Sequence, residues 1–206
     1  MQRQWFVAFE GLDGSGTTTQ SKLLAEFLRS EGVAVVLTKE PTEGFVGKRI
    51  RAVLRKQATA TPLELQQMFV ADRREHMGNL VEPALKSGKV VITDRYMFST
   101  LAFGGLGVDM EKLRAMNSAF RVPEMTFIID VPPDTALDRV HGRLAQSGKR
   151  REDAELFEED GKLERVRANY LRVAKLYPNV HVINGDRKKE EVEMDVRRIV
   201  LEKIKL

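Results

Sequence analysis

The chain has 206 residues, 42% of them hydrophobic, and a formal net charge of +4 at pH 7, which fits one α/β domain over residues 1–206 with a sizeable core. The absence of cysteine excludes disulfides, cysteine nucleophiles and thiolate metal sites. No apolar run approaches the ~20 residues of a membrane span, and there is neither a signal-peptide pattern nor a dense basic stripe with interleaved aromatics, so we expect a cytoplasmic protein with no membrane or nucleic-acid partner.

Short apolar runs alternate with helical patterns along the whole chain. The predicted strands are Trp5–Phe9, Val33–Thr38, Val90–Thr93, Thr126–Asp130 and Val180–Ile183. Helical periodicity marks Ser21–Ser30, Gly47–Lys56, Pro62–Lys86, Glu111–Ala119, Asp134–Gly142, Phe157–Leu176 and Glu190–Ile204. Short strands rich in Val, Ile or Phe are typical of a parallel sheet that is covered on both sides. The alternation predicts a doubly wound, five-stranded parallel α/β fold with helices on both faces and ligands at the carboxyl ends of the strands.

A glycine-rich segment directly after the first strand matches most of a phosphate-binding loop. In the pattern G-x-x-x-x-G-K-[ST], Gly11 and Gly16 hold the glycine positions and Thr18 the hydroxyl position. Thr17 stands where the lysine belongs. Glycines let successive N–H groups point at phosphate oxygens, and the helix that follows adds partial positive charge. The candidate phosphate-binding residues are Gly11, Gly14, Ser15, Gly16, Thr17, Thr18 and Thr19. The alternative is an ordinary Gly/Ser/Thr turn between a strand and a helix.

Charged residues also follow the second and third strands. Glu40 precedes Pro41, which fixes a turn at the edge of the predicted cleft. Asp94 and Arg95 close the third strand, where an aspartate can hold a metal-bound water and an arginine can clamp a phosphate. The alternatives are a common Glu-Pro turn and an Asp-Arg turn with a surface ion pair.

Two predicted helices carry further candidates. Phe69 and Arg73 are four residues apart and share one helix face, so the ring could stack on a base whose edge the guanidinium binds. Spacing alone favours a plainer interpretation, a core phenylalanine beside a surface arginine. Taken by itself, Arg51 is a surface cation. No role is assigned to the histidines, which lack metal-ligand spacing: His76, His141 and His181.

The segment Gly142–Asp160 differs from the rest of the chain in composition. It contains Arg143, Lys149, Arg150 and Arg151, followed by an acidic cluster, and few apolar residues anchor its first half. We interpret it as a short basic lid between two helices. The alternative is a solvated charged loop, which is the commoner case for an isolated run of charge.

In their order and spacing, these segments resemble the thymidylate kinases, nucleoside monophosphate kinases of the P-loop class. The resemblance covers most of the chain and rests on the basic lid and on the runs FEGLDGSGTTTQ, TKEPT, GKRIR, FVADRREH, DRYMFSTLAF and FIIDVPPDTALDR. It implies in-line transfer of a phosphoryl group from ATP to dTMP, giving dTDP for dTTP biosynthesis. It further implies Mg²⁺ as the cofactor and a homodimer.

The resemblance also implies roles for single residues. Thymine would stack on Phe69 and bond to Arg73. The deoxyribose would lie over Phe103 with its 3′-hydroxyl near Asp13. The other residues implied for the dTMP site are Glu40, Arg51, Arg95 and Thr100.

Catalysis is implied for Asp94, which would bind Mg²⁺ together with Thr18, and for Arg95. Because the phosphate loop holds no arginine, the chain is closer to the members that carry a catalytic arginine in the lid. The candidates there are Arg143, Arg150 and Arg151, and Arg150 and Arg151 are our choice.

Two positions depart from the family pattern. Thr17 replaces the lysine that bridges the donor phosphates, and the loss of such a donor can cost ~10²–10³ in rate. Phe103-Gly104 stands where many bacterial members have Tyr-Gln, which removes a possible base contact. The alternatives are therefore a nucleotide-binding protein with weak or lost kinase activity, and a kinase for another nucleoside monophosphate.

Overall fold

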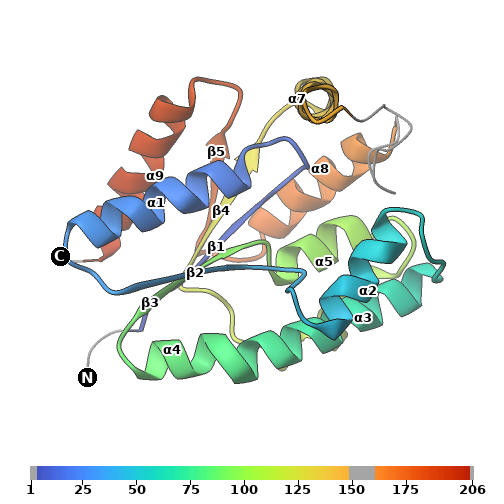
Figure 1. Ribbon diagram of the computed structural model, residues 1–206, viewed down its shortest axis with the longest axis horizontal. Helices are drawn as coiled ribbons and strands as arrows, with labels where there is room; N and C mark the ends of the chain where they lie inside the picture. Colours follow the sequence, from blue (N-terminus) through green and yellow to red (C-terminus); the bar gives the residue numbers. More distant parts are fainter. Residues whose placement is uncertain (1–3, 149–160, 205–206) are drawn as a thin grey trace.

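The computed structural model describes residues 4–148 and 161–204, and a parallel sheet forms their centre (Figure 1). Its strands are β1 (Phe6–Gly11), β2 (Val35–Lys39), β3 (Val90–Asp94), β4 (Met125–Asp130) and β5 (Val180–Asn184). The strand order is β2-β3-β1-β4-β5, and every pairing is parallel. The predicted five-stranded parallel α/β fold is confirmed.

The sheet brings three strand ends to one edge. In the register of the sheet, Phe9 of β1 and Lys39 of β2 both lie level with Asp94 of β3. The loops that follow these strands therefore start side by side, as the sequence predicts for a ligand site at the carboxyl ends of parallel strands.

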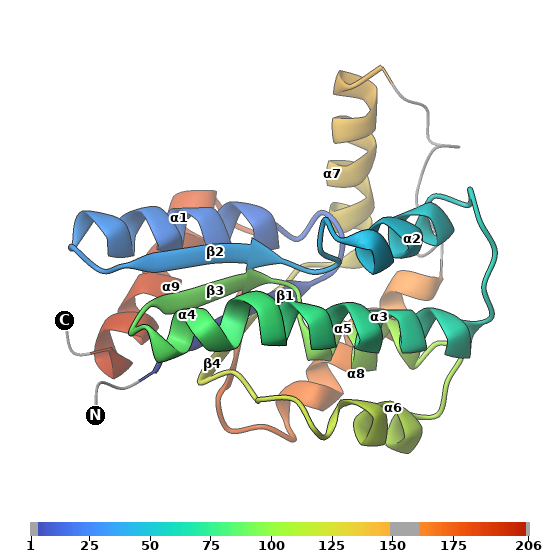
Figure 2. The same ribbon diagram turned by 60° about the horizontal axis from the view of Figure 1, so that its bottom comes forward.

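Helices cover both faces of the sheet (Figures 1 and 2). On one face, α1 (Thr17–Ser30) and α9 (Lys189–Lys203) pack against Val7 and Phe9 of β1. On the other face, apolar side chains pack against Phe6 and Ala8 of β1. They come from α4 (Glu82–Lys86), α5 (Met97–Gly104) and α8 (Lys162–Ala174). Alternate residues of β1 thus belong to two hydrophobic cores, because successive side chains of a strand point to opposite faces of the sheet.

The helix predicted over Pro62–Lys86 is confirmed, with a π-helical turn inside it. It consists of α3 (Pro62–His76), the π-helical turn η1 (Met77–Val81) and α4. Its start is well defined, because Thr61 and Glu64 form a reciprocal capping box. Apolar residues of α2 (Phe45–Leu54) pack against α3 and fix the position of the α3 amino-terminal half.

Two differences from the predicted helices bear on the site, and helix α1 also starts four residues before the predicted Ser21. Helix α5 was not predicted, because nearly all of its residues are buried and an all-round apolar helix lacks an amphipathic stripe. Helix α7 (Pro133–Gln146) continues four residues beyond the predicted end, so the first part of the proposed lid segment is helical. In Figure 2, α7 rises away from the sheet.

The remaining helix, α6 (Met110–Asn117), lies close to its predicted position. None of the helices in the described part of the chain is long and apolar enough to cross a membrane. The lid residues Arg150 and Arg151 lie outside the described residues.

Candidate active site

The phosphate-loop segment bends tightly between β1 and α1. At Gly14, where φ is +88°, a Cβ atom would lie 2.3 Å from the carbonyl oxygen of Ala136. Gly16 has φ +104° and precedes the first residue of α1, which no side chain in the described residues caps. Glycine is thus needed for the path of the loop, and the free N–H groups at the start of α1 face an open site that suits an anion.

A pocket with basic walls surrounds this segment, and we call it the loop pocket. It is lined by Asp13, Gly14, Ser15, Gly16, Thr17, Thr18, Thr19, Gln20, Arg95, Arg139, Gly142, Arg143, Gln146, Gly185, Arg187, Lys189 and Val192. Four of its cations come from distant elements: Arg139 and Arg143 from α7, Arg187 from the β5–α9 connection, and Lys189 from α9. The loop that lacks its lysine therefore lies in positive surroundings supplied by other segments.

The two side chains that the sequence suggests for a metal meet at Thr18, which lines this pocket. The Thr18 hydroxyl donates a short hydrogen bond to Oδ2 of Asp94. Asp94 Oδ1 and Ser15 Oγ are buried and have no hydrogen-bond partner in the part of the chain that the structure describes. Carboxylate and hydroxyl oxygens are hard ligands of the kind Mg²⁺ takes, usually alongside water and substrate phosphates. The residues present therefore fit a magnesium site completed by a nucleotide.

Arg95 lies at the boundary between the loop pocket and a second pocket, and it lines both. Its guanidinium donates to Oδ1 of Asp13 at 2.6 Å and to the carbonyl of Gly11 at 2.8 Å. The backbone of Arg95 has φ +72°, and its N–H donates to Phe9 O at 2.8 Å. The strained turn after β3 thus places the charged guanidinium of Arg95, held by these hydrogen bonds, at the junction of the two pockets.

The second pocket, which we call the α3 pocket, opens between α2, α3 and α5. It is lined by Asp13, Lys39, Glu40, Pro41, Arg51, Leu54, Gln66, Phe69, Arg73, Arg95, Tyr96, Ser99, Thr100 and Phe103. All the residues that the resemblance implies for a dTMP site are among them. The structure therefore brings these predicted residues together, and their binding roles stay predictions.

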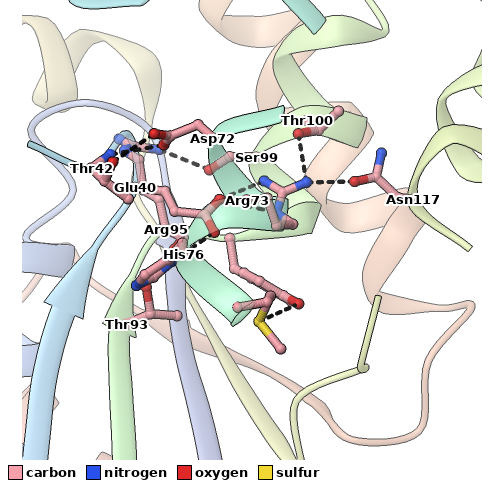
Figure 3. A network of polar contacts seen from close by, with 12 residues as sticks. Glu40, Thr42, Asp72, Arg73, His76, Thr93, Arg95, Ser99, Thr100 and Asn117 are labelled. Carbon is pink, nitrogen blue, oxygen red and sulfur yellow. Dashed lines mark hydrogen bonds and ion pairs between the residues drawn. The ribbon is translucent and has the colours of Figure 1, made fainter. Parts of the chain in front are cut away.

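Arg73 is the centre of a buried polar network (Figure 3). Its Nε and Nη2 donate to the same oxygen of Glu40, at 3.0 and 2.7 Å. Its Nη1 donates to Thr100 and, in a short hydrogen bond, to Asn117. The side chain is 1% exposed and lies over the ring of Tyr96. The interpretation of Arg73 as a surface arginine is therefore wrong.

The donor count leaves Arg73 room for one more partner. Four of the five N–H donors of its guanidinium are used by Glu40, Thr100 and Asn117. The remaining donor, on Nη2, has no partner among the described residues. Arg73 can therefore donate one hydrogen bond to a ligand in the α3 pocket without breaking the network.

The loop after β2 is held by α3 through residues to which the sequence analysis assigned no role. Asp72 accepts hydrogen bonds from the backbone N–H and the hydroxyl of Thr42, at 2.8 and 2.6 Å. His76 contacts Glu40 at 3.0 Å and Thr38 at 2.8 Å. A histidine that positions a loop needs no metal-ligand spacing, so the role of His76 was not predicted. The signal available was the run DRREH, which places Asp72 and His76 four residues apart on one helix face.

Arg51 also binds this loop. It donates to the carbonyl oxygens of Pro41 and Thr42, at 3.0 and 2.7 Å, and pairs with Glu43 at 2.9 Å. It still lines the α3 pocket with an 18% exposed side chain. It is therefore a partly buried cation with several backbone contacts, which the sequence did not indicate.

Glu10 lies beneath the site, fully buried, and accepts hydrogen bonds from the Tyr96 backbone and from the hydroxyls of Ser99 and Tyr170. Burial raises the pKa of Glu10 from 4.5 to about 7, against the hydrogen bond from Ser99 and the charge of Arg95. Between pH 4.5 and 7, Glu10 is therefore protonated in the folded state and ionised in the unfolded chain. Because the unfolded chain binds fewer protons in this window, the contribution of Glu10 to the free energy of unfolding falls as the pH rises.

We expect Glu10→Gln, which cannot ionise, to remove this pH dependence. The free energy of unfolding of the wild type, relative to Glu10→Gln, should fall by about 3 kcal/mol between pH 4.5 and pH 8. Urea denaturation of both proteins over this pH range measures the difference. Parallel curves for the two proteins would show that Glu10 has an ordinary pKa in the fold.

Comparison with known proteins gives a consistent result along the chain. A family model described as thymidylate kinase matches residues 9–196. A probable thymidylate kinase of Pyrococcus horikoshii is 36% identical over 207 residues, which cover 96% of each chain. A probable thymidylate kinase of Thermococcus kodakarensis is 37% identical, with 95% of each chain covered. The thymidylate kinase of Desulfotalea psychrophila is 34% identical over 97% of this chain and 96% of its own.

Proposed function

The chain belongs to the thymidylate kinase family, and on this premise we propose that it transfers the γ-phosphoryl group of ATP to dTMP. A 5′-phosphate oxygen of dTMP attacks the γ-phosphorus, the bond to the bridging oxygen breaks, and dTDP and ADP leave. The observation that carries the proposal is the junction of the loop pocket and the α3 pocket, because Asp13 and Arg95 line both. Two substrates that exchange a phosphoryl group must meet at such a junction.

The donor phosphates are assigned to the loop pocket. Backbone N–H groups of the phosphate loop and the start of α1 would bind them, and Thr18 and Asp94 would hold Mg²⁺ with them. When bound, this ion neutralises charge on the donor phosphates. We propose that the cations of the loop pocket supply the charge that Thr17 cannot, and that Arg150 and Arg151 add to it from a lid over residues 142–160.

The acceptor is assigned to the α3 pocket. Phe69 stacks on thymine, and the remaining donor of Arg73 bonds its edge. Arg51 and Arg95 hold the acceptor phosphate, while Glu40 and Thr100 position Arg73. Phe103 and Asp13 lie along the sugar. Their shared position in one pocket supports these assignments. We also propose a homodimer on family membership, which light scattering on purified protein would test.

The proposal is tested by the rate of ADP release with Mg·ATP and each of dTMP, dUMP, dCMP and dGMP. Turnover that depends on dTMP is expected, with dTMP the best acceptor. Binding of dTMP without turnover would instead favour a nucleotide-binding protein with weak or lost kinase activity. Faster turnover with another acceptor would favour a kinase for that nucleotide. Nothing in the described site favours either alternative.

A further inference from the structure

Gln66 on α3 presents an unsatisfied buried amide at the wall of the α3 pocket. The residue is 2% exposed, yet its Oε1 atom is buried without a hydrogen-bond partner among residues 4–148 and 161–204. Leaving a buried amide oxygen unpaired costs free energy, so nearly all such atoms in folded proteins have a partner. A bound ligand in the α3 pocket can supply the partner that the chain does not.

The position of Gln66 relates it to the residues assigned to the base. Gln66, Phe69 and Arg73 follow each other at intervals of three and four along α3, so they lie on one helix face. All three line the α3 pocket. The amide therefore belongs to the same wall as the stacking ring and the guanidinium. Its neighbour Gln67 is exposed and does not line the pocket.

Gly104 of α5 leaves the space that this amide occupies. A Cβ atom at Gly104 would lie 2.9 Å from Cδ of Gln66 and 3.0 Å from its Oε1. Any side chain at position 104 would therefore push the amide away from its present place. At position 104 the sequence analysis notes the loss of a possible base contact. The glycine found there makes room for the amide of Gln66.

We propose that Gln66 is a specificity-determining residue that reads position 3 of the base. Its Oε1 accepts the N3–H of thymine, while the free Nη2 donor of Arg73 bonds the neighbouring carbonyl oxygen. Cytosine has no proton on N3 and carries an amino donor beside it, so its N3 would face the acceptor Oε1 of Gln66 and its amino group the free donor of Arg73. The inference rests on the proposed function and adds to it a source of selectivity for a keto pyrimidine.

The test compares Gln66→Met, which keeps the length of the side chain but removes the amide, with Gln67→Met as the matched control. Acceptors are dTMP and N3-methyl-dTMP, which has no proton to give to Oε1. We expect Gln66→Met to lower kcat/KM for dTMP by ~10-fold, mainly through KM, because one buried hydrogen bond is lost. The value for N3-methyl-dTMP and the KM for ATP should stay unchanged, and Gln67→Met should match the wild type.

Gly104→Ala provides a second variant, because its Cβ displaces the amide without removing it. It should lower the ratio of kcat/KM for dTMP over N3-methyl-dTMP in the same direction as Gln66→Met. Equal losses for both acceptors in both variants, or no loss at all, would overturn the proposal. If the wild type shows no dTMP-dependent turnover, the proposed function fails, and titration calorimetry with the same two nucleotides and variants then tests Gln66 by binding alone.

Discussion

Replacing Arg95 by methionine is expected to lower kcat/KM for dTMP by ~10²–10³. The guanidinium of Arg95 is held at the junction of the two pockets by Asp13 and by the carbonyl of Gly11. A donor fixed in this way needs no reorganisation as charge develops on the transferred group, so its removal costs transition-state stabilisation directly. Steady-state kinetics with varied dTMP at saturating Mg·ATP measure the loss.

Two further variants define what Arg95 supplies. Arg95→Lys keeps the positive charge but not the planar fork, and we expect it to lie between the wild type and Arg95→Met. Arg114→Met, at an exposed arginine paired with Glu111 outside both pockets, should leave kcat/KM unchanged. Full activity in Arg95→Lys would show that charge alone is needed at this position. Full activity in Arg95→Met would show that Arg95 has no role in the reaction.

The parts of the fold that the sequence predicted are those specified locally. Each strand is a short apolar run, and the phosphate loop is a contiguous pattern of glycines and hydroxyls between a strand and a helix. Their common edge follows from parallel topology, so the meeting of Thr18 with Asp94 was predictable although the residues are distant in sequence. Helix α5 was missed because it is buried on every side, which leaves no periodic signal in the sequence.

The features that were not predicted depend on partners far along the chain. Arg73 is interpreted as a surface residue from its spacing with Phe69, but Glu40 and Asn117 bury it. Gln66 shows no signal in sequence, since its unpaired amide and its contact with Gly104 exist only in the packed structure. A polar side chain on a helix reveals its role only when its neighbours from other elements are known.

The missing lysine illustrates the same limit at the phosphate loop. The sequence identifies Thr17 as the substitution but cannot say which other cations lie nearby, because they come from α7, α9 and the loop before α9. Arg143 differs from the other three, since no hydrogen bond or ion pair joins its side chain to any residue of 4–148 or 161–204. Electrostatic stabilisation of a phosphate depends on the summed field, and several cations can replace one.

Replacing Arg73 by methionine should lower the free energy of unfolding by about 3–5 kcal/mol, because Glu40 would remain as a buried carboxylate that has lost its main partner. Glu40 has a 2% exposed side chain, and His76 would then be its one remaining side-chain partner among the described residues. Urea denaturation measures the change. Arg74→Met is the matched control, since Arg74 is the next residue of α3 and is exposed. It should change the free energy of unfolding by less than about 0.5 kcal/mol.

A double-mutant cycle separates the buried charge from the lost packing of the arginine stem. The cycle compares Arg73→Met, Glu40→Gln and the double variant with the wild type. In the double variant a neutral amide replaces the carboxylate, so it should be more stable than Arg73→Met alone, which is a strong positive coupling. Binding of dTMP should be lost in both variants, because the donor to the base is absent from each. Additive effects on stability would mean that Arg73 and Glu40 stabilise the fold independently of each other, and the ion-pair interpretation would then be wrong. The size of the coupling energy therefore decides whether the α3 pocket is built around an ion pair between Arg73 and Glu40.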